Sequence, residues 1–343
     1  MKMTLHRFDL ALRHAFTIAR GTTHVQRTLV VELSDGVHSG YGEAPETDYY
    51  GATIEAITAA LDSARAKIEA IEPSEDGTIT WPADFWQAMQ PDLASQPFAQ
   101  CALDQAAHDL WGKRLGQPVY RLWGLLPEHR PPTDYTIGID ELDKMIAKLR
   151  EMPDFPVYKI KLGTPHDVEI VRQLRQHTDA IFRVDANCGW SADEAIEKSR
   201  QLAELNVQFI EQPLPPEDTD GMRRVYAETS LPVIADESCI AEPDVAKCAE
   251  YFHGVNVKLV KCGGMTPARR MIDEARSLGL RTMVGCMTES TVGISAIAQL
   301  LPLLDYVDMD GPLLLAEDVA SGVRIERGIV HYAQENGNGV RLL

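Results

Sequence analysis

The sequence predicts an α/β protein whose main domain is a parallel β/α barrel of the TIM type, joined to a smaller α+β domain. The first observation is a repeat. Short apolar runs that end in a charged residue recur every 22 to 26 residues over residues 157–258, the length of one strand, one helix and two loops. The second is length, because 343 residues exceed the roughly 250 of a lone barrel.

The first 125 residues lack this repeat and are expected to form an α+β capping domain. Residues 27–43 alternate polar and apolar side chains around an Asp-Gly pair, which is typical of a β-hairpin. Residues 51–72 have helical spacing, and residues 97–115 have the pattern of an amphipathic helix. A polar, proline-containing loop over residues 73–82 is expected between these two helices.

The barrel is expected over residues 126–311, with eight strands in a modified (β/α)7β arrangement. The expected strands are YTIGI at residues 135–139, VYKIK ending at Lys161, IFRVD at Asp185, VQFIE at Glu211, PVIAD at Asp236, GVNVK at Lys258, RTMVG at Gly285 and YVDMD at Asp310. Helical spacing over residues 164–177 and 192–205 supports this alternation. Residues 312–343 look strand- and turn-like, and they are expected to return to the capping domain and complete it.

Composition excludes several classes of protein. A formal net charge of −18 argues against nucleic-acid binding, which needs clustered Lys and Arg. The acid excess is best explained by a solvated surface, and it does not exclude an anionic substrate, because local groups dominate a cleft. No apolar run of about 18 residues is present, so no contact with a membrane through a spanning helix is expected.

The six cysteines show no CxxC or other metal-ligand spacing, and the N-terminus has no apolar stretch of signal-peptide length. Such cysteines are typical of reduced thiols, and they indicate a cytoplasmic protein. The thiols near strand ends are better explained by packing than by catalysis.

Three carboxylates stand at the ends of successive expected strands: Asp185, Glu211 and Asp236. Because the C-terminal strand ends of a barrel converge on one face, these side chains are expected to meet there. Mg²⁺ prefers such a set of hard oxygen ligands. The alternative, that each acid only caps a neighbouring helix, explains one acid well and three in register poorly.

Lysines flank these acids. Lys159 and Lys161 share one face of their strand. Two neighbouring ammonium groups disfavour each other's charge, so the pKa of one is expected to be lowered toward neutrality, as a general base requires. Lys258, at the end of the sixth strand, is expected to face the same ligand. The alternative is that Lys258 and Lys261 are both surface lysines.

With these residues in place, the chain resembles the enolase superfamily, in the subgroup typified by muconate-lactonising enzymes, over essentially its whole length. The motifs that carry the resemblance are Lys159-Ile-Lys161, Asp185-Ala-Asn187, Glu211-Gln-Pro213, Asp236-Glu-Ser238 and NVKLVKCGG at residues 256–264. Each motif alone is modest, and their order and spacing together are specific.

The resemblance implies one Mg²⁺ per subunit and a shared half-reaction, in which a base removes the α-proton of a metal-bound carboxylate substrate; Lys or His bases with Mg²⁺ are known for this superfamily. By the same resemblance Lys161 and Lys258 are the two acid/base residues on opposite faces of the α-carbon. Lys159 would contact the substrate carboxylate. Lys258 is favoured over Lys261 because it lies at the strand end, whereas Lys261 belongs to the following turn.

The last strand distinguishes between members of the subgroup. It ends Asp308-Met309-Asp310, so both acids point the same way. In the dipeptide epimerases a DxD at this place grips the α-ammonium of the substrate. The alternative is local capping or pairing of the two acids.

The segment FTIARGTTHVQR at residues 16–27 resembles the mobile loop that covers the active site in the subgroup. Arg20 falls where the Ala-Glu epimerases carry an arginine for the side-chain carboxylate of the substrate. The alternative is an exposed loop arginine with no ligand. Residues 44–53 resemble a second lid loop, and Thr136 and Met287 are expected to add substrate contacts.

The resemblance therefore implies an isomerase, a dipeptide epimerase and most of all an L-Ala-D/L-Glu epimerase of murein-peptide metabolism. Its partner would be the small dipeptide, and a homo-oligomer is one possibility because the subgroup commonly assembles. The alternatives are an N-acylamino acid racemase or an o-succinylbenzoate synthase-like lyase of the same subgroup. A non-enzymatic binding or structural barrel is disfavoured, because no expected catalytic position is degraded.

Overall fold

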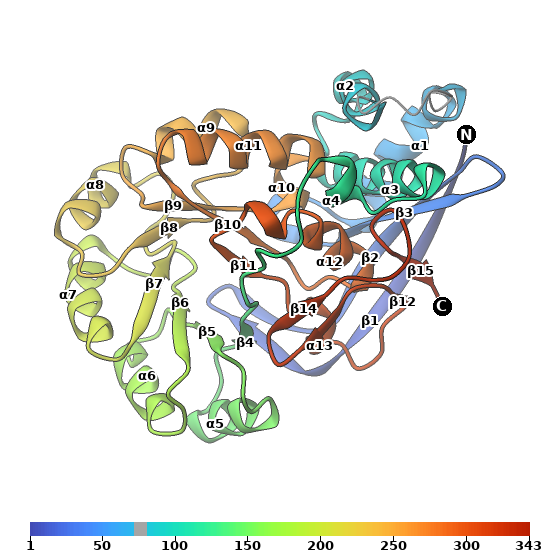
Figure 1. Cartoon of the computed structure of the whole chain (residues 1–343). Coiled ribbons are helices and arrows are strands. Elements are labelled where there is room, and N and C mark those ends of the chain that lie inside the picture. The colour runs from blue at the N-terminus through green and yellow to red at the C-terminus, as the bar shows by residue number, and fades with distance from the viewer. Residues whose placement is uncertain (72–80) are drawn as a thin grey trace.

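The structure, a computed structural model, describes residues 1–71 and 81–343. A barrel of eight parallel strands stands beside a three-stranded antiparallel sheet, and the helices of the barrel lie on its outer side (Figure 1). Residues 73–80 of the loop expected over residues 73–82 lie outside the described residues, and its last two residues, Trp81 and Pro82, begin a helix instead. None of the helices in the described ranges is both long and apolar enough to cross a bilayer.

The antiparallel sheet consists of β1 (Lys2–Ile18), β2 (Gly21–Ser34) and β3 (Ser39–Pro45). Between β2 and β3, Asp35 accepts hydrogen bonds from two backbone N–H groups, which confirms the predicted hairpin. Because β3 pairs with β2 only from Thr28 onward, the far ends of β1 and β2 extend beyond the sheet as a two-stranded hairpin. We call residues 16–27 the hairpin tip.

The helices of this region are α1 (Ile54–Ala70), α2 (Trp81–Leu93), α3 (Pro97–Leu115) and α4 (Val119–Leu122), with a 3₁₀ turn, η1, at Asp48–Tyr50. Both predicted helices are confirmed. The prediction that α3 is amphipathic is wrong, since every residue from 98 to 112 is buried. The sheet covers one side of α3, where Gly40 and Gly42 leave no room for a Cβ against the helix. Helix α2 and the later helix α10 (Leu259–Cys262) cover the other sides.

All eight predicted barrel strands are present, in sequential parallel order. They are β4 (Tyr135–Ile137), β5 (Val157–Lys161), β6 (Ile181–Asp185), β7 (Val207–Glu211), β8 (Val233–Ala235), β9 (Gly254–Val257), β10 (Arg281–Gly285) and β11 (Tyr306–Asp308). The helices between them are α5 (Leu142–Glu151), α6 (Asp167–Arg175), α7 (Ala192–Ala203), α8 (Thr219–Glu228), α9 (Glu242–Cys248), α10 (Leu259–Cys262), α11 (Met265–Ser277) and α12 (Thr291–Ala298), followed by the 3₁₀ turn η2 (Leu301–Leu303).

The barrel closes at a seam between its first and last strands. A single parallel bridge, Thr133 to Val307, replaces a ladder between β4 and β11. The buried Arg183 of β6 reinforces the seam, because its Nη1 donates to Asp134 Oδ2 at 2.9 Å and to the Val307 carbonyl at 2.8 Å. The guanidinium also lies over the Tyr306 ring, 5.2 Å from its centroid. A charged side chain thus fills the barrel interior and holds the seam together.

After the barrel come α13 (Gly311–Leu314), β12 (Ala320–Ser321), β13 (Arg324–Glu326), β14 (Ile329–His331) and β15 (Arg341–Leu342). Ala316 bonds to Ala11 of β1, and the Val340 carbonyl accepts from Lys113 at 2.8 Å. Gly328 bonds to Thr133 beside the barrel. The tail therefore contacts both parts of the molecule, and the division of the chain at residue 125 stays a prediction.

We expect Arg183→Ala to lower the free energy of unfolding by about 3–5 kcal/mol, because it leaves the carboxylate of Asp134 buried without its partner. Chemical denaturation monitored by circular dichroism measures this. The control is Arg172→Ala, which breaks an exposed ion pair with Glu169 and should leave the unfolding midpoint unchanged. Equal effects of the two variants would contradict a special role for the seam.

Candidate active site

The C-terminal ends of the barrel strands open into a cavity of about 570 Å³ that the hairpin tip and residues 46–50 cover. Most residues singled out from the sequence line it: Arg20, Thr136, Lys161, Asp236, Lys258, Met287, Asp308 and Asp310. Lys159, Asp185 and Glu211 are fully buried behind the lining residues, where Lys159 contacts Asp308 and Asp185 contacts Lys161. The fold thus brings together every residue that the sequence nominated, from nine separate segments of the chain.

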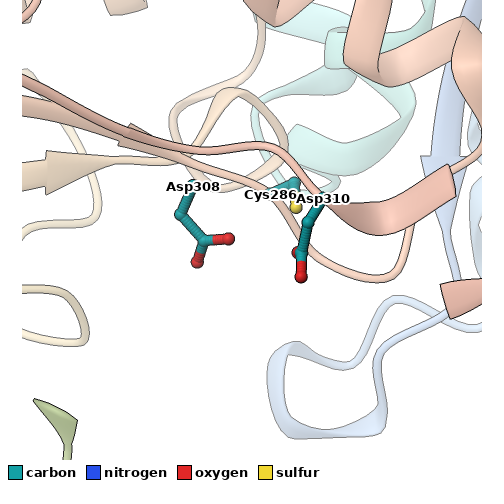
Figure 2. A group of neighbouring side chains, drawn as sticks. All are labelled: Cys286, Asp308 and Asp310. Atoms are coloured by element: carbon teal, nitrogen blue, oxygen red, sulfur yellow. The ribbon is translucent and has the colours of Figure 1, made fainter. Parts of the chain in front are cut away.

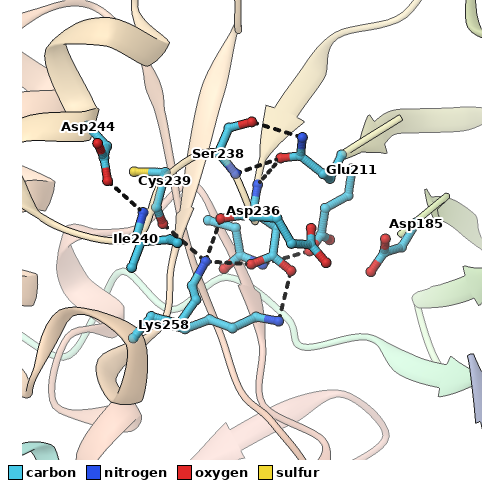
Figure 3. A network of polar contacts seen from close by, with 12 residues as sticks. Asp185, Glu211, Asp236, Ser238, Cys239, Ile240, Asp244 and Lys258 are labelled. Atoms are coloured by element: carbon cyan, nitrogen blue, oxygen red, sulfur yellow. Dashed lines mark hydrogen bonds and ion pairs between the residues drawn. The ribbon is translucent and has the colours of Figure 1, made fainter. Parts of the chain in front are cut away.

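Three carboxylates meet at this end of the barrel, as Figure 3 shows. Asp185 and Glu211 are the last residues of β6 and β7 and are paired in register, while Asp236 directly follows β8. One oxygen of each lies within 4.8 Å of the others. Second contacts orient them, since Asn256 Nδ2 donates to Glu211 Oε1 at 2.8 Å and the Asn187 N–H donates to Asp185.

The donor set fits a hard divalent cation. Three buried oxygen ligands at such separations suit one small cation that completes its octahedron with other oxygens. Burial raises the pKa of Glu211 to about 7, with the charges of Asp185 and Asp236 adding to the effect of burial. Glu211 Oε2 is buried and accepts no hydrogen bond among the described residues, its one partner being the ammonium of Lys159 at 2.8 Å. A cation there would relieve the repulsion.

Two lysines line the cavity from opposite sides. Lys161 ends β5 and Lys258 follows β9, and the order of strands places β5 and β9 four steps apart in a barrel of eight. Lys161 Nζ lies 2.7 Å from Asp185 Oδ2. Lys258 Nζ lies 2.9 Å from Asp236 Oδ2, a contact drawn in Figure 3. The carboxylates therefore stand between two ammonium groups that face each other across the barrel.

At Lys159 the effect of like charge expected for one lysine of the Lys159/Lys161 pair is outweighed. Burial lowers its pKa, but the carboxylates of Asp308, Glu211 and Asp185 outweigh burial and raise the pKa well above its usual value. The pKa of Lys258 is also raised, since Asp236 outweighs burial. Carboxylates of several strands, the adjacent ones included, outweigh the effect of like charge on both pKa values.

Lys261 differs from both expectations for it. It lies in α10 rather than in a turn, and its side chain is fully buried rather than on the surface. Its Nζ donates to Asp236 Oδ1 at 2.6 Å and to the Cys239 carbonyl at 3.0 Å. Lys261 therefore orients Asp236 from behind, while Lys258 reaches the cavity.

The acids of the last strand form a second group, shown with Cys286 in Figure 2. Asp308 Oδ2 accepts from Lys159 at 2.8 Å, whereas its Oδ1 is buried without a hydrogen-bond partner among the described residues. Burial raises the pKa of Asp308, but Lys159 outweighs burial and lowers the pKa to about 2. Burial and the charge of Asp308 raise the pKa of Asp310 to about 7, and its Oδ2 accepts from the Thr136 N–H at 2.6 Å.

Sequence reasoning gave no role to Glu237, although the residue was visible inside the Asp-Glu-Ser motif. It lines the cavity, is fully buried, and forms an ion pair with Arg20 at 2.9 Å. Its position directly after Asp236, a carboxylate at a strand end, could have indicated that Glu237 lies at the site. Arg20 thus lies at the cavity, as expected, but it already has an acidic partner.

This fold and this site define a class of barrel enzyme, one that moves protons beside a bound divalent cation. The family model for the mandelate racemase / muconate lactonizing enzyme N-terminal domain matches residues 2–124, and the enolase C-terminal domain-like model matches residues 141–343. The chain belongs to the mandelate racemase / muconate lactonizing enzyme family of the enolase superfamily, which confirms the resemblance seen in its motifs.

Similar proteins match this chain along its whole length. An L-Ala-D/L-amino acid epimerase of Flavobacterium johnsoniae is 54% identical over 343 residues, with 100% of both chains covered. An L-Ala-D/L-Glu epimerase of Bacteroides thetaiotaomicron is 38% identical, over 99% of this chain and 88% of that one. The crystal structure of a dipeptide epimerase from Cytophaga hutchinsonii, complexed with Mg and D-Ala-L-Val, superposes with a TM-score of 0.91 at 26% identity, covering 100% and 96% of the two chains.

We expect Mg²⁺ binding to release a proton below pH 7, because the carboxyl of Glu211 is protonated there and must ionise to bind a cation. The apparent affinity should weaken about tenfold for each pH unit below 7. The metal-free protein should lose stability as pH rises toward 7, since the folded-state pKa lies above the unfolded value. Titration calorimetry in two buffers of different ionisation enthalpy counts the protons.

Glu211→Gln is the control for that measurement, because it removes the titrating group while keeping the shape of the site. It should bind Mg²⁺ more weakly and release no proton. Proton release from the wild-type protein that is zero at pH 6 would contradict the expected protonation of Glu211.

Proposed function

We propose that the chain is a dipeptide epimerase that uses one Mg²⁺ per subunit and inverts the α-carbon of the second residue, with L-Ala-D/L-Glu among its substrates. The observation that carries this proposal is the pair of lysines, Lys161 and Lys258, which face each other across the carboxylates. A single base can only remove and return a proton on one face of carbon. Two opposed bases allow removal on one face and delivery on the other, which is inversion.

The residues divide the work as follows. Asp185, Glu211 and Asp236 would hold Mg²⁺, which supplies positive charge beside the substrate carboxylate and so makes the neighbouring α-proton more acidic. A cation held by these carboxylates would weaken the ion pairs that keep both lysines charged, so that one lysine could release its proton to solvent and then take the α-proton on its Nζ. The opposite lysine, as an ammonium, gives a proton to the other face, so that each turnover exchanges their charges.

The remaining charged groups would position the dipeptide. The ammonium of buried Lys159 adds positive charge next to the carboxylates and would assist in holding the substrate carboxylate. Oδ1 of Asp308, which has no hydrogen-bond partner in the described part of the chain, offers a buried anionic acceptor for the α-ammonium of the dipeptide. Arg20, Thr136 and Met287 would line the rest of the substrate site.

Asp308 also weighs against the alternatives. An N-acylamino acid racemase or an o-succinylbenzoate synthase-like lyase acts on substrates without an α-ammonium, and these would leave an ionised, buried oxygen of Asp308 unpaired. A purely structural role would leave the opposed lysines and the carboxylate cluster without purpose. A dipeptide substrate accounts for all of these charged groups.

We also propose a setting for the enzyme. All six cysteines lie in the described ranges as free thiols, which suits the reducing cytoplasm. An alanyl-glutamate substrate suits the metabolism of murein peptides. Assembly into a homo-oligomer stays a prediction.

Incubation with L-Ala-L-Glu and Mg²⁺ in D₂O, followed by proton NMR, tests the function. The Glu α-proton signal should disappear while the signals of L-Ala-D-Glu appear. Exchange without inversion would contradict the two-base mechanism. A protein that exchanges N-succinyl amino acids but no dipeptide would instead be a racemase.

Lys161→Ala and Lys258→Ala should each abolish inversion, because each removes one of the two proton carriers. We expect each variant to keep residual exchange with only one of the two diastereomers, and the two variants to differ in which one. The same NMR assay, started separately from L-Ala-L-Glu and L-Ala-D-Glu, measures this. Exchange of the same diastereomer by both variants would place both lysines on one face.

Asp308→Asn should raise KM for L-Ala-L-Glu by about tenfold or more, because a charge-assisted hydrogen bond to the substrate ammonium is lost. N-acetyl-L-Ala-L-Glu, which has no ammonium, is the comparison substrate and should be affected less. Equal losses for the two substrates would assign Asp308 to holding Lys159 rather than to binding substrate.

A further inference from the structure

An ion pair joins the hairpin tip to the barrel at the cavity wall. Arg20 lies at the turn between β1 and β2, and Glu237 directly follows the carboxylate Asp236 after β8. Arg20 Nη2 lies 2.9 Å from Glu237 Oε1. The guanidinium also lies over the Tyr49 ring, 4.4 Å from its centroid. All of these side chains line the cavity.

The pair is unequal in exposure, and this decides what each partner can do. The side chain of Glu237 is 1% exposed, and that of Arg20 is 32% exposed. Neither carboxylate oxygen of Glu237 has a hydrogen-bond partner among the described residues, so Arg20 is its compensating contact there. Because a buried carboxylate without a partner is costly, the positive charge of Arg20 is committed to Glu237.

We propose that Glu237 determines which side chains the cavity accepts at the second residue of the substrate. By holding Arg20, Glu237 offsets the positive charge that Arg20 brings from the hairpin tip to this wall of the cavity. The subsite then favours an uncharged side chain over an acidic one. This inference rests on the proposed dipeptide epimerase function, and it gives that function a substrate class.

The chemistry around the pair supports an uncharged side chain. Ile18 and Tyr50 also line this cavity, and their side chains carry no charge. A substrate glutamate would bring a second carboxylate to a guanidinium that Glu237 already neutralises, and the two carboxylates would repel each other. The remaining donors of Arg20 can still bind that glutamate, so acidic dipeptides are disfavoured rather than excluded.

Substitutions of Glu237 and of Arg20 are expected to shift the substrate preference in opposite directions. Glu237→Gln keeps the shape of the side chain and frees the charge of Arg20, so it should raise the ratio of kcat/KM for L-Ala-L-Glu over L-Ala-L-Gln by about tenfold. Arg20→Met removes the guanidinium that a substrate glutamate would contact, while burial and the neighbouring Asp236 raise the pKa of Glu237 and favour its uncharged form, so this variant should lower the ratio. The double variant should return toward wild-type ratios.

These ratios are measured by NMR with saturating Mg²⁺, and titration calorimetry of the same dipeptides gives binding ratios that do not depend on the chemical step. The matched control is Glu217→Gln, which removes the same charge from an exposed carboxylate close enough to influence Tyr49 but not paired with Arg20. It should leave the ratios unchanged. Circular dichroism verifies that each variant is folded, and Arg20→Met carries the test alone if Glu237→Gln does not fold.

Unchanged ratios in an active Glu237→Gln protein, or an equal shift in Glu217→Gln, would overturn the inference and leave the proposed function intact. A shift of both single variants in the same direction would also overturn it. A wild-type protein that turns over no dipeptide would overturn the proposed function and this inference with it.

Discussion

Compensation of buried charge is the constraint on which this structure depends. Asp185, Glu211 and Asp236 stand on neighbouring strands with their oxygens close together, an arrangement that a folded chain tolerates only when cations face it. Lys159, Lys161, Lys258 and Lys261 supply that charge from both sides of the barrel. The same ammonium groups that stabilise the folded site are the ones that the proposed chemistry uses, so stability and catalysis share a single set of contacts.

The sequence predicted the parts of the site that follow from strand period and position. A polar residue at the end of each apolar run is enough to place its side chain at the barrel opening, so the carboxylates and Lys161 and Lys258 could be named in advance. The lysine pKa could not be predicted in this way. Lys159 contacts Asp308, which lies 149 residues away in the chain, and the sequence around Lys159 does not indicate that contact.

Two other features were out of reach for the same reason, that they arise from packing between distant segments. Helix α3 has the spacing of an amphipathic helix, yet the sheet, α2 and α10 bury it on nearly every side. The pairing of Arg20 with Glu237 depends on how far β1 and β2 extend beyond β3. Sequence patterns describe which face of an element is apolar. Contacts of this kind depend instead on how whole elements pack against one another.

The seam between β4 and β11 has a consequence for how the protein is made. Thr136 bonds to Asp310 across 174 residues, and Arg183 bonds to the Val307 carbonyl across 124. During synthesis the ribosome delivers the earlier strands first, so these contacts cannot form until the last strand has emerged. Until then Arg183 and Asp134, which are buried in the folded protein, remain partly solvated. Folding of the barrel should therefore end with the strand that carries Asp308, and a nascent chain should acquire its carboxylate cluster before it acquires the group proposed to hold the substrate ammonium.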